Sequence, residues 1–287
     1  MARSTSLALP ITFLVISIAS IPTGAALAKR VFPIVGAEGV TAMRLGFSAL
    51  LLLAIWRPNP KAVLDRVVLA YGVSLGAMNL MFYMAIERIP LGLAVALEFT
   101  GPLAVAMVSS RKPLDFAWIG LAVIGLGLLL PINPAAGPLD PTGVALALAA
   151  GGCWAAYILF GAKAGGRLGP GAVAVGVTIG ALFTVPIGVA HAGSALLAPA
   201  ILATGLAVAF FSSMLPYSLE MVALTRLPAK TFGVMMSLEP AFAAVSGMVL
   251  LHETLTPMQW SAIACIMGAS FGSAITARPI PASPHPD

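Results

Sequence analysis

The sequence predicts an all-α integral membrane protein, and three observations lead to this fold class. Hydrophobic residues make up 60% of the 287-residue chain, and only 9% of its residues are charged. A water-soluble protein carries about 25% charged residues, because water must solvate its surface. The apolar residues also gather in long runs, separated by charged residues or by proline, glycine and asparagine. Hydrocarbon is therefore the expected solvent of most of this chain.

Each apolar run is long enough for one membrane crossing, which needs about 20 residues in a helix. Read from the first residue, the runs predict ten transmembrane helices in two sets of five. The first set lies near residues 7–28, 34–56, 67–86, 91–110 and 116–132. The second set lies near residues 142–162, 171–190, 199–222, 229–251 and 257–276. These crossings and their short loops leave no room for a soluble domain.

The two ends of the chain need separate interpretation. Arg3, the first apolar run and the small residues at 26–28 imitate a secretory signal with a cleavage site. That run is long for a signal core, and similar runs follow it, so it is expected to be a retained first helix. Residues 278–287 contain prolines at alternate or nearby positions and are expected to form a disordered cytoplasmic tail.

The distribution of Lys and Arg predicts the orientation, because cytoplasmic loops retain positive charge during insertion. The loops between the expected helices lie alternately on the two sides of the membrane. Most of the Lys and Arg residues fall on the same side as the N-terminus: Arg3, Arg57, Lys61, Arg66, Arg111, Lys112, Lys163, Arg167, Arg226, Lys230 and Arg278. The opposite side carries only Lys29, Arg30 and Arg88, and Arg44 lies inside a helix. Both termini are therefore expected in the cytoplasm.

A short internal repeat divides the chain into residues 1–137 and 138–277. Residues 85–90 (AIERIP) recur as 223–228 (ALTRLP), and Pro102 matches Pro240 at the same spacing. Because five crossings is an odd number, the second half must enter the membrane from the opposite side to the first. Inverted repeats of this kind can give alternating access to a site near the midplane. An old gene duplication without a mechanical role is the alternative.

These features resemble a known family. The Ala-x-x-Arg-[Ile/Leu]-Pro turn of each half and the two proline-containing helices are similar to the EamA family of the drug/metabolite transporter superfamily. Residues 96–103 (ALEFTGPL) and Met43-Arg44 look most like its threonine/homoserine exporter branch. The resemblance covers the chain apart from the tail. It implies an inner-membrane secondary transporter that exports amino acids or related metabolites, without a cofactor; export of another metabolite or drug is the alternative.

Ionisable side chains inside the expected helices are the first candidates for a substrate site. A charge at the bilayer centre costs about 2.5–3.5 kcal/mol unless it faces a cavity or a partner. Arg44, Glu98 and Glu239 lie inside expected helices. Pro102 and Pro240 have no N–H, so each should break a helix beside one of these glutamates. The carboxyls are expected to bind a substrate ammonium and Arg44 a substrate carboxylate; structural ion pairs are the alternative.

Neutral polar side chains complete the candidate substrate site. Asn79 and Tyr83 are four residues apart and share a helix face, and Tyr217 occupies the repeat-equivalent position of Asn79. Hydrogen bonding between helices is the alternative role of these residues. Because burial disfavours an ionised carboxyl, Glu98 is also expected to carry a proton that is coupled to export by antiport.

Other classes of function lack their motifs in this sequence. An intramembrane enzyme is not expected, because His252-Glu253 lacks the second histidine of a zinc-binding helix and no phosphate-binding Gly-rich loop that ends in Lys-Ser/Thr is present. The three histidines and two cysteines are scattered, so neither a metal site nor a disulfide is expected. The basic residues form no cluster, which argues against a nucleic-acid partner. A channel or a structural membrane protein is a further alternative, and a homodimer is left open.

Overall fold

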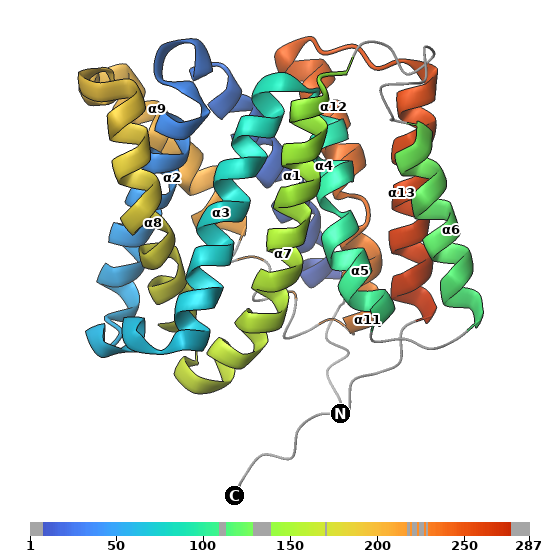
Figure 1. Ribbon diagram of the computed structural model, residues 1–287, viewed down its shortest axis with the longest axis horizontal. Helices are drawn as coiled ribbons and strands as arrows, with labels where there is room; N and C mark the ends of the chain where they lie inside the picture. The colour runs from blue at the N-terminus through green and yellow to red at the C-terminus, as the bar shows by residue number, and fades with distance from the viewer. Residues whose placement is uncertain are drawn as a thin grey trace, which may run out of the picture.

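The computed structural model describes residues 8–108, 113–128, 139–169, 171–216 and 229–276, together with Leu219, Ala223 and Leu227. All of the regular structure in this part of the chain is helical, which confirms the predicted all-α class. Most of the helices run up and down in one bundle (Figure 1). The expected tail at 278–287 lies outside the described residues.

In the described residues, the first half of the chain forms six α-helices and one 3-10 helix. These elements are α1 (Ala8–Lys29), α2 (Phe32–Trp56), η1 (Pro60–Leu64), α3 (Arg66–Arg88), α4 (Leu91–Glu98), α5 (Thr100–Val108) and α6 (Pro113–Leu128). The second half forms α7 (Pro141–Leu168), α8 (Gly171–Ala192), η3 (Gly193–Leu197), α9 (Pro199–Ala209), the π-helical turn η4 (Phe210–Met214), α11 (Ala229–Met236), α12 (Glu239–Leu251) and α13 (Pro257–Thr276). Each expected membrane helix therefore corresponds to helix in the described residues.

Seven helices in the described residues are long and apolar enough to cross a membrane. Three shorter apolar helices accompany them, at Leu91–Val105, Phe116–Leu128 and Pro199–Met214. A chain with this many apolar helices is a multi-pass membrane protein, as the sequence predicts.

Two of the expected helices are broken beside a proline. α4 ends at Glu98, four residues before Pro102, and α12 begins at Glu239, immediately before Pro240. A proline cannot donate a backbone hydrogen bond, and its ring clashes with the carbonyl four residues earlier. The predicted breaks are therefore present, and each of them has a glutamate at its edge.

Acidic caps fix where two helices start. The Asp65 carboxylate accepts the Val67 N–H at 2.8 Å and the Val68 N–H at 3.3 Å, and these bonds start α3. The Val67 N–H holds the pKa of Asp65 below its usual range. Asp140 accepts the Thr142 N–H at 2.8 Å and starts α7 in the same way. Such caps satisfy N–H groups that have no partner inside the first helical turn.

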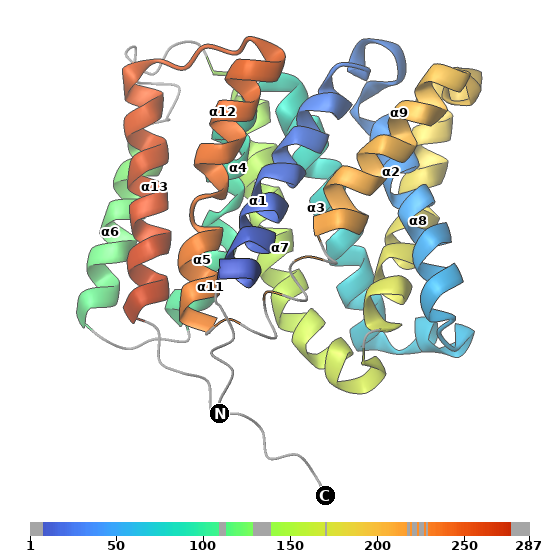
Figure 2. The same cartoon turned by 180° about the vertical axis from the view of Figure 1, so that it is seen from behind.

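Helices of the two halves pack on one another in matched pairs. α2 packs on α8, α4 on α12 and α6 on α13. α3 packs on α7, and α1 correspondingly packs on α9 and η4. Figures 1 and 2 show α6 with α13 at one edge of the bundle and α2 with α8 toward the other. The start of α1 and the end of α13 lie at the same end of the bundle (Figure 2).

Glycines allow α3 and α8 to approach closely. A Cβ atom at Gly76 would lie 2.6 Å from the Gly180 Cα, and one at Gly72 would lie 2.9 Å from the Gly176 carbonyl oxygen. In a membrane, small residues favour helix association because they permit extensive van der Waals contact between backbones. The α3–α8 contact therefore depends on the absence of side chains at these positions.

Gly76→Ala is expected to destabilise the protein by about 1–3 kcal/mol, because the added methyl group overfills the α3–α8 contact. Gly120→Ala in α6 is the matched control, since no atom lies within 4 Å of a Cβ built there. The thermal unfolding midpoint of the purified protein in detergent checks this. Equal midpoints for both variants would contradict the packing described here.

Candidate functional site

A cavity of about 180 Å³ lies among the helices that carry the broken segments. Its walls come from α1, α2, α3, α4, α7, η4, α11 and α12. The lining residues are Ile21, Pro22, Ala25, Arg44, Met78, Asn79, Phe82, Val95, Glu98, Trp154, Tyr157, Ser212, Met236 and Glu239. Most of this wall is apolar, and its charged residues are Arg44, Glu98 and Glu239.

Four of the six residues predicted for the substrate site line this cavity. Arg44, Asn79, Glu98 and Glu239 are buried, with exposed fractions of 7%, 3%, 8% and 6%. They come from helices far apart in the sequence, so the fold brings them together. Tyr83 does not line the cavity and is fully buried behind it. Tyr217 lies outside the described residues.

Arg44 is held by contacts from two directions. Its Nη2 donates to the Ser212 carbonyl at 2.8 Å, and its Nε donates to the Ser213 hydroxyl at 3.3 Å. Its Cζ lies 5.4 Å from the centroid of the Tyr83 ring, in a cation–π contact. Among the described residues it forms no direct ion pair. Because a guanidinium does not lose its charge in a protein, a buried cation remains at the cavity wall.

Glu98 places a carboxyl at the same cavity. Arg44 interacts with it electrostatically, but no direct ion pair joins the two side chains in the described part of the chain. The Glu98 carbonyl, which Pro102 deprives of its helical donor, packs against α7. A Cβ at Gly151 would lie 2.7 Å from this carbonyl oxygen. The cavity thus has a separated cation and carboxyl in its wall.

Glu239 and Asn79 add polar groups to the wall. Glu239 begins α12 and is the counterpart of Glu98 at the second broken helix. The Asn79 amide nitrogen donates to the Leu75 carbonyl at 2.8 Å, which anchors this amide on α3. Both broken helices therefore contribute a carboxyl to one cavity.

Aromatic residues of α7 form a part of the wall that the sequence analysis does not identify. The Trp154 ring packs edge-on against the ring of Phe99, the residue that follows Glu98, with the ring centroids 5.0 Å apart. Tyr157 stacks on Tyr71 at 5.1 Å. Three-residue spacing puts Trp154 and Tyr157 on one face of an otherwise Ala- and Gly-rich helix. This spacing is the signal that could have identified them.

The described residues contain no group of three or more His, Cys, Asp or Glu side chains that could hold a metal ion. Cys153 and Cys265 are free thiols on separate helices. The side chains at the cavity include a guanidinium, two carboxyls, an amide and aromatic rings, which suit the binding of a small polar molecule.

Comparison with known proteins agrees with this arrangement. Residues 141–275 match the EamA-like transporter family. The threonine/homoserine exporter RhtA of Escherichia coli (strain K12) is 55% identical over 273 residues, which are 94% of this chain and 92% of that protein. This chain belongs to the EamA-like transporter family. The family predicted from the sequence motifs is thereby confirmed, and the protein is a transporter and not an enzyme.

Other EamA-like transporters and a solved structure are also similar. RhtA of Salmonella typhimurium (strain LT2) has the same identity and coverage. The uncharacterized transporter YwfM of Bacillus subtilis (strain 168) is 28% identical over 80% of this chain and 81% of its own. One crystal structure aligns with a TM-score of 0.54 at 18% identity, over 98% of this chain and 100% of that one. At that identity the match supports the fold alone.

The ring of Tyr83, and not its hydroxyl, is expected to matter in this EamA-like transporter. The Tyr83 hydroxyl is buried without a hydrogen-bond partner among the described residues, and an unpaired buried hydroxyl is unfavourable. Tyr83→Phe should therefore keep transport and keep or raise the thermal midpoint. Tyr83→Leu should weaken substrate binding and lower stability by up to about 2 kcal/mol, because the cation–π contact is lost.

Transport assays and thermal unfolding of both variants check this expectation. Loss of transport in Tyr83→Phe would instead make the hydroxyl a substrate contact.

Proposed function

We propose that this EamA-like transporter exports threonine, homoserine and related small amino acids across the bacterial inner membrane. The observation that carries this proposal is the guanidinium of Arg44 and the carboxyl of Glu98, which line one cavity without forming a direct ion pair. A free amino acid carries a carboxylate and an ammonium on one carbon atom. Such a molecule can bind Arg44 through its carboxylate and Glu98 through its ammonium at the same time. Both buried side chains then have a polar partner, which an apolar molecule would not supply.

The size of the cavity and the close relatives support a small substrate. Its volume of about 180 Å³ is below the roughly 300–1,000 Å³ typical of sites for drug-sized ligands. An exporter of threonine and homoserine is 55% identical over nearly the whole chain. A small amino acid is therefore a better fit than a large drug.

Arg44 is proposed to bind the substrate carboxylate. Its contacts with Ser212 and Ser213 use two of the five guanidinium N–H donors, which leaves three for a carboxylate. Glu98 and Glu239 are proposed to bind the ammonium, and Asn79 and Tyr217 to contribute polar contacts. Tyr83 acts beneath the guanidinium through its ring.

The proposed mechanism is alternating access between two inverted halves, residues 1–137 and 138–277. The seven candidate spans and three shorter apolar helices would then be ten crossings. The packing of α2 on α8, α4 on α12 and α6 on α13 supports this arrangement, because a pseudo-twofold axis between the halves would pair each of these helices with its own counterpart. Such an axis also relates the two broken helices, α4–α5 and α11–α12.

The proposed orientation has both termini in the cytoplasm. The end of the bundle where α1 starts and α13 ends carries the basic residues near η1 and the end of α7, including Lys61, Arg66 and Arg167. Positive charge of this kind is retained on the cytoplasmic side. The opposite end, with Lys29 and Arg88, would then face the periplasm.

Lys29 and Glu253 form a latch at that opposite end. The Lys29 ammonium lies 2.6 Å from Glu253 Oε1 and also donates to the Ile89 carbonyl at 3.2 Å. Glu253 Oε2 accepts the N–H of Leu91, the first residue of α4, at 2.8 Å. The latch therefore joins the end of α1, the start of α4 and the segment after α12. Opening the cavity toward this end would require these bonds to break.

Glu98 is also proposed to carry the proton that drives export by antiport. It is a buried carboxyl at the cavity wall, where protonation and substrate binding would compete for the same group. Release of the ammonium on one side would then permit a proton to bind.

Glu98→Gln is expected to abolish proton-driven efflux of threonine while leaving the protein inserted in the membrane. Cells that overproduce the protein are loaded with threonine- or homoserine-containing dipeptides, and the amino acids that appear outside are measured. Glu87→Gln, at an exposed ion pair with Arg88, is the matched control and should export normally. Unchanged proton-driven efflux in Glu98→Gln would refute the proton role, and no amino-acid efflux from wild-type cells would refute the substrate class.

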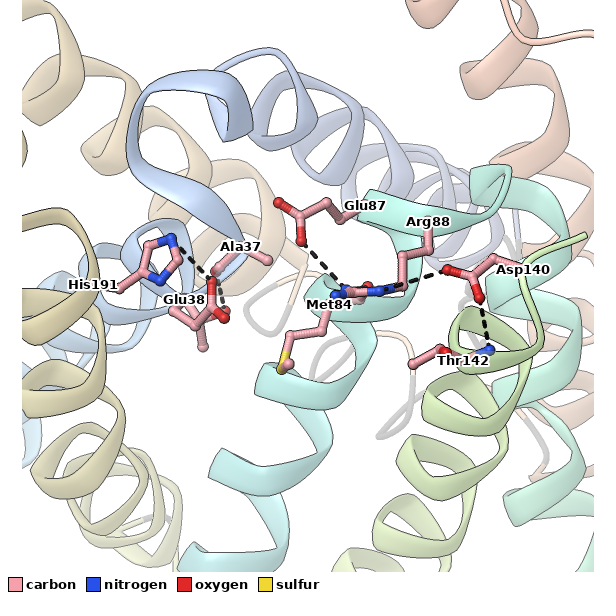
Figure 3. Close-up of polar contacts among 9 residues, drawn as sticks. Ala37, Glu38, Met84, Glu87, Arg88, Asp140, Thr142 and His191 are labelled. Carbon is pink, nitrogen blue, oxygen red and sulfur yellow. Dashed lines mark hydrogen bonds and ion pairs between the residues drawn. The ribbon is translucent and has the colours of Figure 1, made fainter.

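Breaking the latch should favour the conformation that is open to the periplasm. Lys29→Gln is expected to lower the external threonine concentration that half-inhibits transport by about tenfold or more, since hydrogen bonds to charged groups contribute about 1.5–3 kcal/mol and about 1.4 kcal/mol corresponds to a factor of ten. Figure 3 shows the control residue, Arg88, between Glu87 and Asp140 at the same end. These contacts are longer, at 3.4 and 3.6 Å, and more exposed, so Arg88→Gln should have little effect. Equal inhibition in the two variants would argue against a latch.

A further inference from the structure

The π-helical turn η4 contains carbonyl groups to which Pro216 cannot donate. Within it, the Leu215 N–H donates to the Phe210 carbonyl, five residues earlier. Pro216 follows and is buried. Because a proline has no N–H, it cannot donate to the Ser212 carbonyl, as an α-helix requires, or to the Phe211 carbonyl, as a π-helix requires. Inside a membrane protein both carbonyls need a donor from elsewhere.

Two neighbouring helices supply these donors. Arg44 of α2 donates from Nη2 to the Ser212 carbonyl at 2.8 Å. Ser20 of α1 donates from its hydroxyl to the Phe211 carbonyl at 2.6 Å. The two carbonyls to which Pro216 cannot donate are therefore the ones that accept hydrogen bonds from side chains of α1 and α2.

These contacts determine how the guanidinium of Arg44 is turned. Nε and Nη2 form one edge of the planar group, and both bind η4, through the Ser213 hydroxyl and the Ser212 carbonyl. The Tyr83 ring lies against the group at 5.4 Å. With one edge and one neighbouring ring fixed, the remaining N–H donors have a defined direction at the cavity wall.

We infer that Pro216 is a positioning residue for substrate recognition, because it keeps the Ser212 carbonyl available to Arg44 and so orients the guanidinium toward the substrate carboxylate. This inference rests on the proposed function, in which Arg44 binds that carboxylate. Pro216 is not itself among the residues that line the cavity. In a Pro216→Ala variant, the new N–H competes with Arg44 for the Ser212 carbonyl.

Pro186 provides the matched control. It also lies inside an apolar helix, α8, but it lines a separate groove formed by α2, α8, η3 and α9. A Pro186→Ala variant therefore tests the general effect of replacing a membrane proline, without changing a contact to Arg44.

The experiment compares four variants of the full-length protein in proteoliposomes: Pro216→Ala, Arg44→Lys, the double variant and Pro186→Ala. Labelled L-threonine gives KM and the maximal rate for each variant. Inhibition by L-threoninamide, which lacks a carboxylate, is measured in parallel. Pro216→Ala should raise KM for threonine about tenfold, the factor expected from about 1.4 kcal/mol, with a maximal rate near that of the wild type. Inhibition by threoninamide should be unchanged, and Pro186→Ala should behave as the wild type.

The double variant decides whether Pro216 acts through Arg44. Two residues that act through one contact have non-additive effects, so the KM of the double variant should equal that of Arg44→Lys alone. If the increase in KM of the double variant equals the product of the two single-variant increases, the inference is overturned. A Pro216→Ala variant with a lower maximal rate and an unchanged KM would also overturn it. If Arg44→Lys affects KM and Pro216→Ala does not, only this inference fails. If Arg44→Lys leaves KM unchanged, the proposed carboxylate contact fails as well.

Discussion

A proline inside a membrane helix leaves a backbone carbonyl without its N–H donor, and hydrocarbon contains no water to replace that donor. Pro102 and Pro216 impose this constraint near the cavity, and each carbonyl is covered by protein. The Glu98 carbonyl packs against Gly151, and the Ser212 carbonyl accepts a hydrogen bond from Arg44. Irregular backbone is thus kept inside the protein, where the polar side chains also lie.

The same constraint explains where the charges are. A guanidinium facing lipid would be strongly unfavourable, but the carbonyl of η4 and the ring of Tyr83 partly replace its hydration. Glu98 remains apart from it across the cavity wall. The structure therefore keeps a guanidinium and a carboxyl buried without a direct ion pair between them. The proposed binding of a zwitterionic substrate uses this separation.

Much of the fold follows from the sequence, because apolar runs and prolines report local constraints. The helix breaks before Pro102 and Pro240 are examples, and so is the burial of Arg44 at the cavity. The spacing of Trp154 and Tyr157 predicts only that they share a face of α7, since which face meets the cavity depends on packing against other helices. Tyr83 shares a face with Asn79 but lies behind the cavity, because Arg44 covers its ring. Pro216 predicts an irregular turn, but the side chains that donate to the Phe211 and Ser212 carbonyls belong to Ser20 and Arg44, which are distant in the sequence.

An atomic-resolution structure of the protein with bound L-threonine, determined in lipid, tests the central claim most directly. The proposed function predicts the carboxylate of threonine at about 2.7–3.2 Å from the free donors of Arg44. Its ammonium should lie within a similar distance of the Glu98 carboxyl. Threonine bound outside this cavity, or with its ammonium toward Arg44, would contradict the claim that the two separated charges recognise the two ends of an amino acid.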